Sequence, residues 1–467
     1  MAAGWKHSPS LQMGFVEYQD FLHKTYGRVV GTYSGRMPVL HVTDTAMLKQ
    51  IMVKDFSNFS NRSTVMNDYP LDQSLPVLQD DVWKRVRSQM TPAFSSGKLK
   101  QMTVSINDCA DIMVNSLKKK TGEDVNMRKL TNAFTMDVIC RVAFGIQVDS
   151  EQDPENSFVK NARGFTQANM LYVMIAIGIP PLYKLLQNLF NATLFPKKML
   201  DFFCQVTEKL IEERKQEDQA RTDMLHLMMK ALEIEPDQED IDEDGETGFK
   251  YQSSAKGKIG MSKHEMMGNT MIFFLAGSET TATALTYLSY CLALHPDIQQ
   301  RLTAEVDKHA GKEEVITPAM YSKMTYLEMC IKETLRIYPS SVRAERMCSK
   351  DTRVGQYLVP RGAMVAIPIR TIQHDPEYWP QPLTFNPDRF SANAKSTMDP
   401  LTWLPFGFGP RNCIGMRLAL MEVKIAAIKL LQNFQFETCS QTKVPLTFMN
   451  NTLLQTDSPI TLRVVER

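Results

Sequence analysis

Phe406-Gly407-Phe408-Gly409-Pro410-Arg411-Asn412-Cys413-Ile414-Gly415 is the most informative segment of this sequence. A single cysteine, Cys413, ends a glycine-rich loop directly before a predicted helix. Backbone N–H groups and the positive end of a helix stabilise a negative sulfur, so this placement favours the thiolate form. Gly407 and Gly409 let the backbone fold tightly beneath a flat ligand, and Gly415 leaves room for close approach.

Outside this segment the composition is that of an ordinary globular protein. The 467 residues are 43% hydrophobic and 22% charged, which excludes a disordered, collagen-like or coiled-coil chain. Lys plus Arg number 53 and Asp plus Glu 52, and this balance argues against a nucleic-acid partner. The eight cysteines include no C-x-x-C pair, so we expect a reducing, cytosol-facing environment without a disulfide framework or a zinc site.

Hydrophobic periodicity predicts a mainly α-helical fold with small β-sheets. The longest predicted helix covers 261–295 and, at about 1.5 Å per residue, is long enough to cross a large domain. The other predicted helices cover 83–90, 99–120, 130–144, 197–217, 327–338 and 415–433. Strands are predicted at 29–33 and 37–42, within 355–369, and as a C-terminal hairpin of 444–448 with 460–465.

Two segments differ from the rest in composition. The apolar segment 169–195 contains Pro180-Pro181 and predicts two short helices, which either pack inside the protein or dip into a membrane surface. The segment 233–258 begins with nine acidic side chains within 233–246 and predicts a flexible, solvated loop. The longest apolar run has ten residues, fewer than the ~20 that a membrane span needs, so we expect a chain without its own N-terminal anchor.

Two further motifs carry chemistry. Glu333-Thr334-Leu335-Arg336 places a carboxylate and a guanidinium on one helix face, where they can pair with each other. Ala276-Gly277-Ser278-Glu279-Thr280-Thr281 lies inside the longest predicted helix. A helix-interior glycine and a hydroxyl that bonds back to a carbonyl predict a local widening of this helix beside the acid and the alcohol of Glu279 and Thr280.

The three motifs together resemble those of the cytochrome P-450 superfamily of haem-thiolate monooxygenases. Phe406, Gly409, Cys413 and Gly415 occupy the fixed positions of its haem signature, F-x-x-G-x-x-x-C-x-G. The resemblance covers about 15–465 and is strongest to the microsomal family-3 type. It implies a cytochrome P-450 fold of the α+β class as one catalytic domain, 1–467. Haem b would lie between the long central helix and the helix after the cysteine loop.

The resemblance also implies a role for each matching residue. Cys413 would bind the haem iron, and Glu279 and Thr280 would be catalytic. The cofactor-binding residues would be Arg62, Trp83, Arg87, Ala276, Arg346, Phe406, Arg411 and Gly415. Glu333, Arg336 and Arg389 would form a structural lock. The residues of an apolar substrate pocket would be Pro76, Val77, Ile272, Phe273, Ser341 and Val342.

The activity implied by the resemblance is the insertion of one atom of O₂ into a lipophilic substrate such as a xenobiotic, a steroid or a fatty acid. Gly407-x-Gly409 lacks the third glycine of a dinucleotide fingerprint, so electrons are expected from a partner. In the family that partner is the diflavin NADPH–cytochrome P-450 reductase, joined in some cases by cytochrome b5, on the cytosolic face of the endoplasmic reticulum membrane. Lys84, Lys98, Lys100, Arg417 and Lys424 are candidates for a basic docking face.

Two other functions stay open at this point. One is a haem-thiolate isomerase or dehydratase resembling thromboxane synthase, which needs neither O₂ nor a reductase. The other is a non-enzymatic haem or lipid carrier. The acid and alcohol of Glu279 and Thr280 favour oxygenation over both. A zinc protease is excluded, because His264-Glu265-Met266-Met267-Gly268 lacks the second histidine of H-E-x-x-H.

Overall fold

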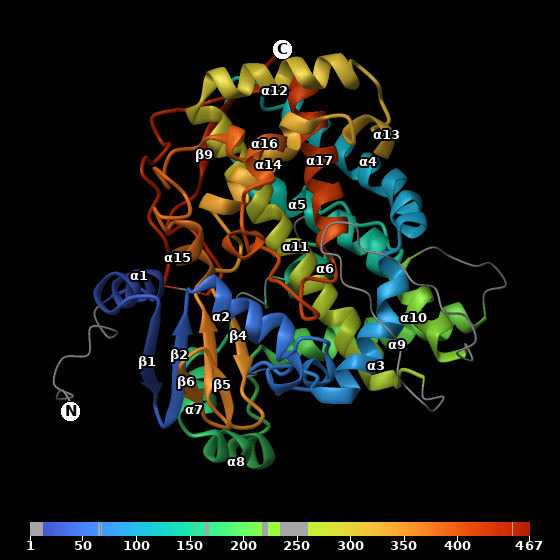
Figure 1. The fold of residues 1–467 in the computed structure, drawn as a ribbon. Helices are drawn as coiled ribbons and strands as arrows, with labels where there is room; N and C mark the ends of the chain where they lie inside the picture. The colour runs from blue at the N-terminus through green and yellow to red at the C-terminus, as the bar shows by residue number, and fades with distance from the viewer. Residues whose placement is uncertain are drawn as a thin grey trace.

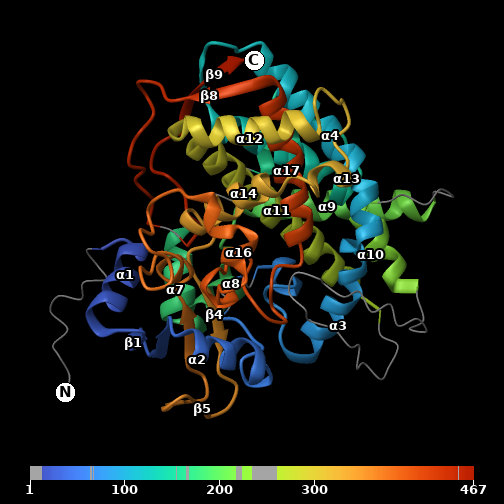
Figure 2. The same ribbon diagram turned by 45° about the horizontal axis from the view of Figure 1, so that its top comes forward.

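Helices make up most of the molecule in the computed structural model, which describes residues 13–467 except 64, 65, 67, 154, 163, 165–167, 217–222, 234–259 and 451. The four-stranded sheet and the β5–β6 pair lie together at one side of the helices (Figure 1), as the rotated view also shows (Figure 2). The prediction of a mainly helical fold with small sheets is therefore confirmed. The predicted acidic loop, 233–258, lies outside the described residues except for residue 233, which ends α10.

The helices predicted from periodicity are confirmed to within a few residues, and several short ones are added. In chain order they are α1 (Phe15–Tyr26), α2 (Thr45–Lys49), α3 (Asp80–Met90), α4 (Ser96–Lys118), α5 (Met127–Ile139), α6 (Ser157–Ala162), α7 (Met170–Gly178), α8 (Pro180–Phe190), α9 (Lys197–Lys215), α10 (Met224–Glu233), α11 (Lys263–Leu294), α12 (Pro296–His309), α13 (Pro318–Tyr321), α14 (Thr325–Ile337), α15 (Ile369–Gln373), α16 (Ala392–Lys395) and α17 (Met416–Asn433).

Three sheets contain the strands. Their bounds are β1 (Val29–Ser34), β2 (Met37–Val42), β3 (Asp124–Asn126), β4 (Ala344–Met347), β5 (Thr352–Val354), β6 (Tyr357–Val359), β7 (Met364–Ile367), β8 (Phe434–Glu437) and β9 (Thr461–Glu466). The strand orders are β1-β2-β7-β4, β3-β9-β8 and β5-β6. The predicted C-terminal hairpin is wrong, because β9 pairs with β3 and β8 while the segment 444–448 forms only an isolated bridge at Phe448 and Thr456.

Helix α11 runs through the middle of the molecule and organises the main core (Figure 1). Ser262 caps its first turn, and the Glu265 side chain bonds back to the cap, so the helix begins at a defined residue. Pro296 follows its last turn and starts α12. Helix α11 packs against α5, α14 and α17, and thereby connects the cysteine loop with the Glu333 motif.

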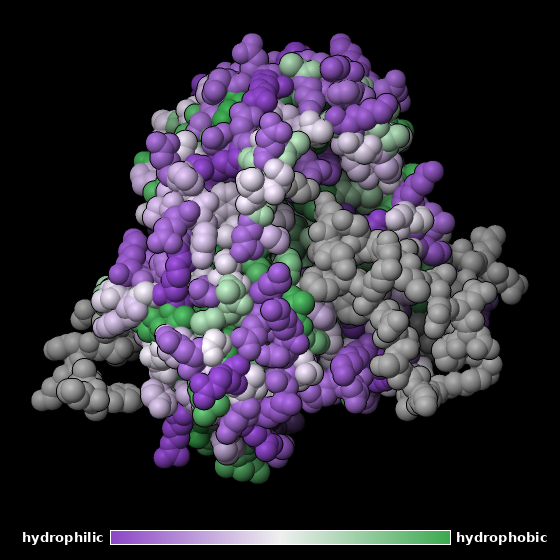
Figure 3. All heavy atoms as spheres, viewed as in Figure 1, coloured by the Kyte–Doolittle hydropathy of each residue, from purple (hydrophilic) through white to green (hydrophobic). Residues whose placement is uncertain are grey.

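Helices α7 and α8 form a hairpin, here called the apolar hairpin (169–195), which confirms the two predicted short helices. Pro180 is the first residue of α8, where its missing N–H costs no helical hydrogen bond. The two helices pack mainly on each other. Most of their outward side chains are apolar and exposed, with Lys184 and Asn188 as polar exceptions on α8. In Figure 3 hydrophobic spheres mark the lower edge where Figure 1 places α8. These side chains are Met170, Leu171, Met174, Ile179, Leu182, Leu185, Leu189 and Phe190.

Candidate active site

The cysteine loop folds tightly onto itself before α17. The backbone N–H of Cys413 donates to the Phe406 carbonyl at 2.8 Å, and that of Gly407 donates to Leu404 at 2.9 Å. Gly407 and Gly409 both have φ of 72°, a conformation that favours glycine. At Gly409 a Cβ atom would stand 2.2 Å from a backbone carbonyl oxygen, that of Met52, so no larger residue fits there. The two glycines therefore permit the tight fold of the backbone that the sequence predicts, and Gly409 also permits a close backbone contact.

Cys413 is the only cysteine with an exposed side chain among the described residues. Protein atoms nevertheless surround its sulfur, and burial raises the pKa of the thiol. The Gly415 backbone N–H and the guanidinium groups of Arg87 and Arg62 act in the opposite direction but do not cancel the burial. An accessible sulfur inside the protein lines an internal space. The predicted preference for thiolate is thus not produced by the protein alone, because desolvation outweighs the donors.

Three arginines from other segments gather around Arg411 of this loop. Arg87 on α3 donates to the Asn412 carbonyl at 3.1 Å and to its side-chain oxygen at 2.9 Å, and Arg62 donates to the Arg411 carbonyl at 2.9 Å. Arg346 on β4 is 1% exposed, and Arg411 is 3% exposed. Burial, together with the positive charges of Arg62, Arg346 and Arg87, lowers the pKa of Arg411 to about 8.

Arg411 is held rigidly between the loop that precedes α3 and an aromatic ring. Its guanidinium donates to the carbonyls of Ser60 at 2.7 Å, Leu75 at 3.1 Å and Leu78 at 2.7 Å. The same group lies 4.0 Å from the centre of the Trp83 ring, a cation–π distance. Trp83 and Arg87, both expected to bind the cofactor, are thus brought next to the cysteine loop.

The middle of α11 presents an open face although nearly all of its C-terminal half is buried. Ala276 is exposed, and the Thr280 hydroxyl donates to the Ala276 carbonyl at 2.6 Å. The predicted widening of this helix is not observed, because α11 is described as one continuous α-helix. Gly277 serves packing instead, since a Cβ atom there would meet the Ile139 side chain at 2.8 Å.

Glu279 lies one residue from Thr280 but bonds in another direction. Its Oε1 forms an ion pair with Arg128 on α5 and accepts a hydrogen bond from the Gln455 amide at 2.8 Å. Its side chain is 18% exposed, so water reaches the carboxylate. The structure therefore does not join the two predicted catalytic side chains directly. Arg128 and Gln455, the partners of Glu279, belong to none of the sequence motifs and lie far from Glu279 along the chain, so the sequence did not predict them.

The predicted lock residues come together in a fully buried ion pair. Glu333 and Arg336 are 0% exposed, and Arg336 Nε donates to Glu333 Oε2 at 2.6 Å. Arg389 Nε lies 3.3 Å from Glu333 Oε1. Arg336 also donates to the carbonyls of Gln373 at 2.8 Å and Pro382 at 2.7 Å, so it connects α14 to two separate loops.

The six predicted pocket residues lie in different surroundings. Phe273 is half-buried and packs edge-on against Phe94 at 5.6 Å between ring centres. Ile272 and Val342 are buried in the main core, and Val77 is also buried, at 8% exposed. The remaining two, Pro76 and Ser341, are half-buried. Complete burial gives Val342 the packing of an ordinary core residue.

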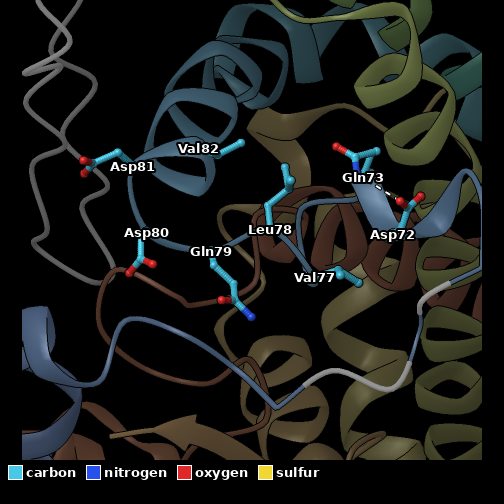
Figure 4. Close-up of a pocket in the computed structure, with 8 residues that line it drawn as sticks. All are labelled: Asp72, Gln73, Val77, Leu78, Gln79, Asp80, Asp81 and Val82. Carbon is cyan, nitrogen blue, oxygen red and sulfur yellow. Dashed lines mark hydrogen bonds between the residues drawn. The ribbon is translucent and has the colours of Figure 1, made fainter. Parts of the chain in front are cut away.

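A hollow of about 600 Å³ opens on the surface where the loop that precedes α3 meets this helix (Figure 4). It is lined by Asp72, Gln73, Val77, Leu78, Gln79, Asp80, Asp81 and Val82. None of these belongs to the cysteine loop or to α11, so the hollow is not the space that Cys413 lines. Within the described residues no cluster of three or more His, Cys, Asp or Glu side chains could hold a metal ion.

Comparison with known proteins decides the family. The sequence profile of cytochrome P450 matches residues 5–464. The chain belongs to the cytochrome P450 family. Cytochrome P450 3A9 of Rattus norvegicus is 36% identical over 97% of this chain and 88% of its own length. Cytochrome P450 3A29 of Sus scrofa is 37% identical over 95% and 85%, and cytochrome P450 3A1 of Rattus norvegicus is 37% identical over 97% and 88%.

Membership of the P450 family makes the chain an oxidoreductase, a monooxygenase that uses haem b with an axial thiolate. The residues present fit this group. A buried cluster of four arginines is unfavourable by itself, as the lowered pKa of Arg411 shows, and anionic propionates together with a thiolate would balance it. The exposed Cys413 lies in the cysteine loop directly before α17, and the exposed Ala276 lies on α11. Helices α11 and α17 contact each other. The P450 cofactor would therefore sit where the sequence predicts it.

The five basic residues predicted as a docking face differ in their exposure and in their ion pairs. They are Lys84 on α3, Lys98 and Lys100 on α4, and Arg417 and Lys424 on α17. The Lys424 side chain is only 14% exposed and pairs with Glu328 at 3.3 Å, so it contributes little positive charge to a surface. The Lys84 side chain is 55% exposed and pairs with the exposed Asp81 at 3.0 Å, a weak pair that a partner can replace.

Proposed function

We propose that this P450 oxygenates a lipophilic small molecule with electrons that NADPH supplies through a diflavin reductase, with cytochrome b5 as a second donor. We further propose that residues 1–467 form one catalytic domain at the cytosolic face of the endoplasmic reticulum membrane. The observation that carries the proposal is the accessible Cys413 inside the protein, on a loop that holds or contacts four arginines and leads into α17, a helix that packs against α11. Haem b, when bound, supplies the activation of O₂.

The role that we propose for each residue of the site follows from its contacts. Cys413 would bind the iron, and Arg62, Trp83, Arg87, Arg346 and Arg411 would balance or brace the propionates. Thr280 would hold a proton at its Oγ1, next to the exposed Ala276. Glu279 would connect this position with water, because its carboxylate is partly exposed and held by Arg128 and Gln455.

The apolar hairpin supports the proposed membrane contact. Its outer side chains are large, apolar and exposed over two successive helices, which is costly in water and favourable at a lipid surface. No helix among the described residues is long and apolar enough to cross a bilayer. We therefore expect the purified chain to sediment with phosphatidylcholine vesicles.

The ligand assignment is tested by the spectrum of the reduced protein with CO. The parent protein should show the band of a thiolate-ligated haem, and Cys413→Ser should lose it. Cys439→Ser, a matched control at a half-buried cysteine, should retain it. A normal thiolate band in Cys413→Ser would overturn the assignment.

The reaction is tested by reconstitution with a diflavin reductase and a panel of lipophilic compounds. Haem spectral shifts identify those that bind, and mass analysis identifies their products. Each oxygenated product should consume NADPH and gain one oxygen atom from ¹⁸O₂. Turnover that leaves NADPH untouched would instead support an isomerase or dehydratase.

A further inference from the structure

Asp68 is a buried carboxylate outside the proposed site, and it is 1% exposed. Its Oδ1 accepts from the Tyr183 hydroxyl at 2.8 Å and from the Gln187 amide at 3.4 Å. Its Oδ2 accepts from the backbone N–H groups of Leu194 at 2.6 Å and Phe195 at 3.1 Å. All four donors belong to the apolar hairpin, so one carboxylate gathers both the second helix and the end of this hairpin.

The apolar hairpin behaves as a small unit of its own. Ala176, Tyr183 and Leu194 form a separate hydrophobic cluster inside it. The Asn169 N–H donates to the Leu194 carbonyl at 2.7 Å and closes its base. Its helices pack mainly on each other rather than on the body of the protein. A charged group with four hydrogen bonds is therefore a strong mechanical link between this unit and the rest of the chain.

The chain that follows Asp68 leads directly to the site. The Leu75 N–H donates to Asn269 of α11 at 2.8 Å, which fixes the loop on the central helix. Arg411 of the cysteine loop donates to the carbonyls of Leu75 and Leu78. Only a short loop thus separates the carboxylate that holds the hairpin from the carbonyls that hold Arg411.

We propose that Asp68 is a positioning residue that couples the apolar hairpin to the loop beside the haem site, so that the seating of the hairpin on a phospholipid surface sets the affinity of the site. The role of the phospholipid surface rests on the proposed membrane contact. The coupling between the hairpin and the loop does not depend on it. Asparagine is a poor substitute for Asp68, because it removes the charge that strengthens all four hydrogen bonds. Its oxygen can serve the backbone N–H groups of Leu194 and Phe195 only if its NH₂ group faces Tyr183 and Gln187, which would both have to turn from donor to acceptor. Asp72→Asn makes the same change four residues later, where the carboxylate accepts from the Gln73 side chain and not from the hairpin.

The test measures binding of 1-phenylimidazole to the haem-loaded protein by its spectral shift, without lipid. We expect Asp68→Asn to weaken binding about fivefold, the lower end of coupling between linked sites, and Asp72→Asn to change it less than about twofold. Tyr183→Phe should cause a smaller weakening. The double variant of Asp68→Asn and Tyr183→Phe should match Asp68→Asn alone, because Tyr183 acts through the carboxylate.

Hydrogen exchange gives a second readout that ligand affinity does not determine. In Asp68→Asn the amides of Leu194, Phe195 and Leu75 should exchange faster, while amides of α17 should stay protected. Unchanged affinity together with unchanged exchange at Leu75 would overturn the proposal. If Asp68→Asn does not load haem, Tyr183→Phe decides by the same two measurements.

Vesicle binding separates this inference from the proposed function. Asp68→Asn keeps the apolar outer faces and should still sediment with phosphatidylcholine vesicles, whereas vesicles should alter 1-phenylimidazole affinity more in the parent than in this variant. A parent that does not sediment refutes the membrane contact, and the lipid-free comparison of Asp68→Asn with Asp72→Asn still decides the coupling. An equal vesicle effect in parent and Asp68→Asn would refute the coupling alone.

Discussion

Replacing Arg336 by lysine tests whether the buried lock stabilises the fold. The guanidinium uses Nε and one terminal nitrogen on the two oxygens of Glu333, and it reaches the carbonyls of Gln373 and Pro382 with its terminal nitrogens. Lysine keeps the charge but offers donors from a single point, so it cannot serve both carboxylate oxygens and both carbonyls. The loss of about two of these four hydrogen bonds leaves buried acceptors unpaired at about 1–3 kcal/mol each, so we expect a total cost of about 3–5 kcal/mol.

This cost translates into a measurable shift of the thermal midpoint. An unfolding entropy of about 2.1 cal/mol/K per residue gives roughly 1 kcal/mol/K for 467 residues, so Arg336→Lys should lower Tm by about 3–5 °C. The assay is loss of helical circular dichroism in haem-loaded protein at one fixed scan rate. The control is Lys197→Met, which breaks the exposed pair with Asp201 and should shift Tm by less than about 1 °C. Equal shifts in the two variants would refute the argument from burial.

Three further substitutions have expected results. Gly409→Ala should lower Tm and haem content at least about twice as much as Gly407→Ala. Both glycines have a positive φ, but only a Cβ atom at position 409 would meet a carbonyl oxygen. The same melts give Tm, and the haem absorbance gives the haem content. Arg128→Gln removes the cation paired with Glu279 and should change the ratio of product to NADPH consumed by about twofold or more; an unchanged ratio would argue against a proton relay through that carboxylate. Burial raises the pKa of Asp137 to about 6, so stability is lost as pH rises through that value, and the Tm advantage of Asp137→Asn should grow by roughly 1–2 °C from pH 5 to pH 8.

Local sequence patterns predicted the long helices well because their apolar faces and stop signals lie within the same segment. They failed where a partner comes from far away. Strand β9 pairs with β8 and β3 instead of with the neighbouring segment 444–448. Helix α1, which no pattern predicted, is held by Asp20, which accepts from Thr371 at 2.6 Å. Contacts with partners tens to hundreds of residues away leave no periodic signal, so neither feature could be predicted from local composition.

The candidate site shows the same division. Motif spacing correctly anticipated that Glu333 and Arg336 share a helix face, since three residues make nearly one turn. It could not anticipate the direction of the Glu279 side chain, because its partners Arg128 and Gln455 stand outside every motif. Asn412, which accepts from an arginine on α3, lies inside the haem signature at a variable position and so carried no signal.

The arginines that received one common role from the sequence are separated by their contacts. Arg411 places donors on three carbonyls, two of them Leu75 and Leu78, and stacks on Trp83, so its geometry is that of a brace between two loops. Within the described part of the chain Arg62 makes one hydrogen bond, to the Arg411 carbonyl, and its other donors can serve an anion. Loss of Arg411 should therefore disturb the position of the cysteine loop, whereas loss of Arg62 should remove mainly charge. In a chain whose net charge is only +1, this local concentration of buried positive groups is the strongest sign that the interior is built around an anionic ligand.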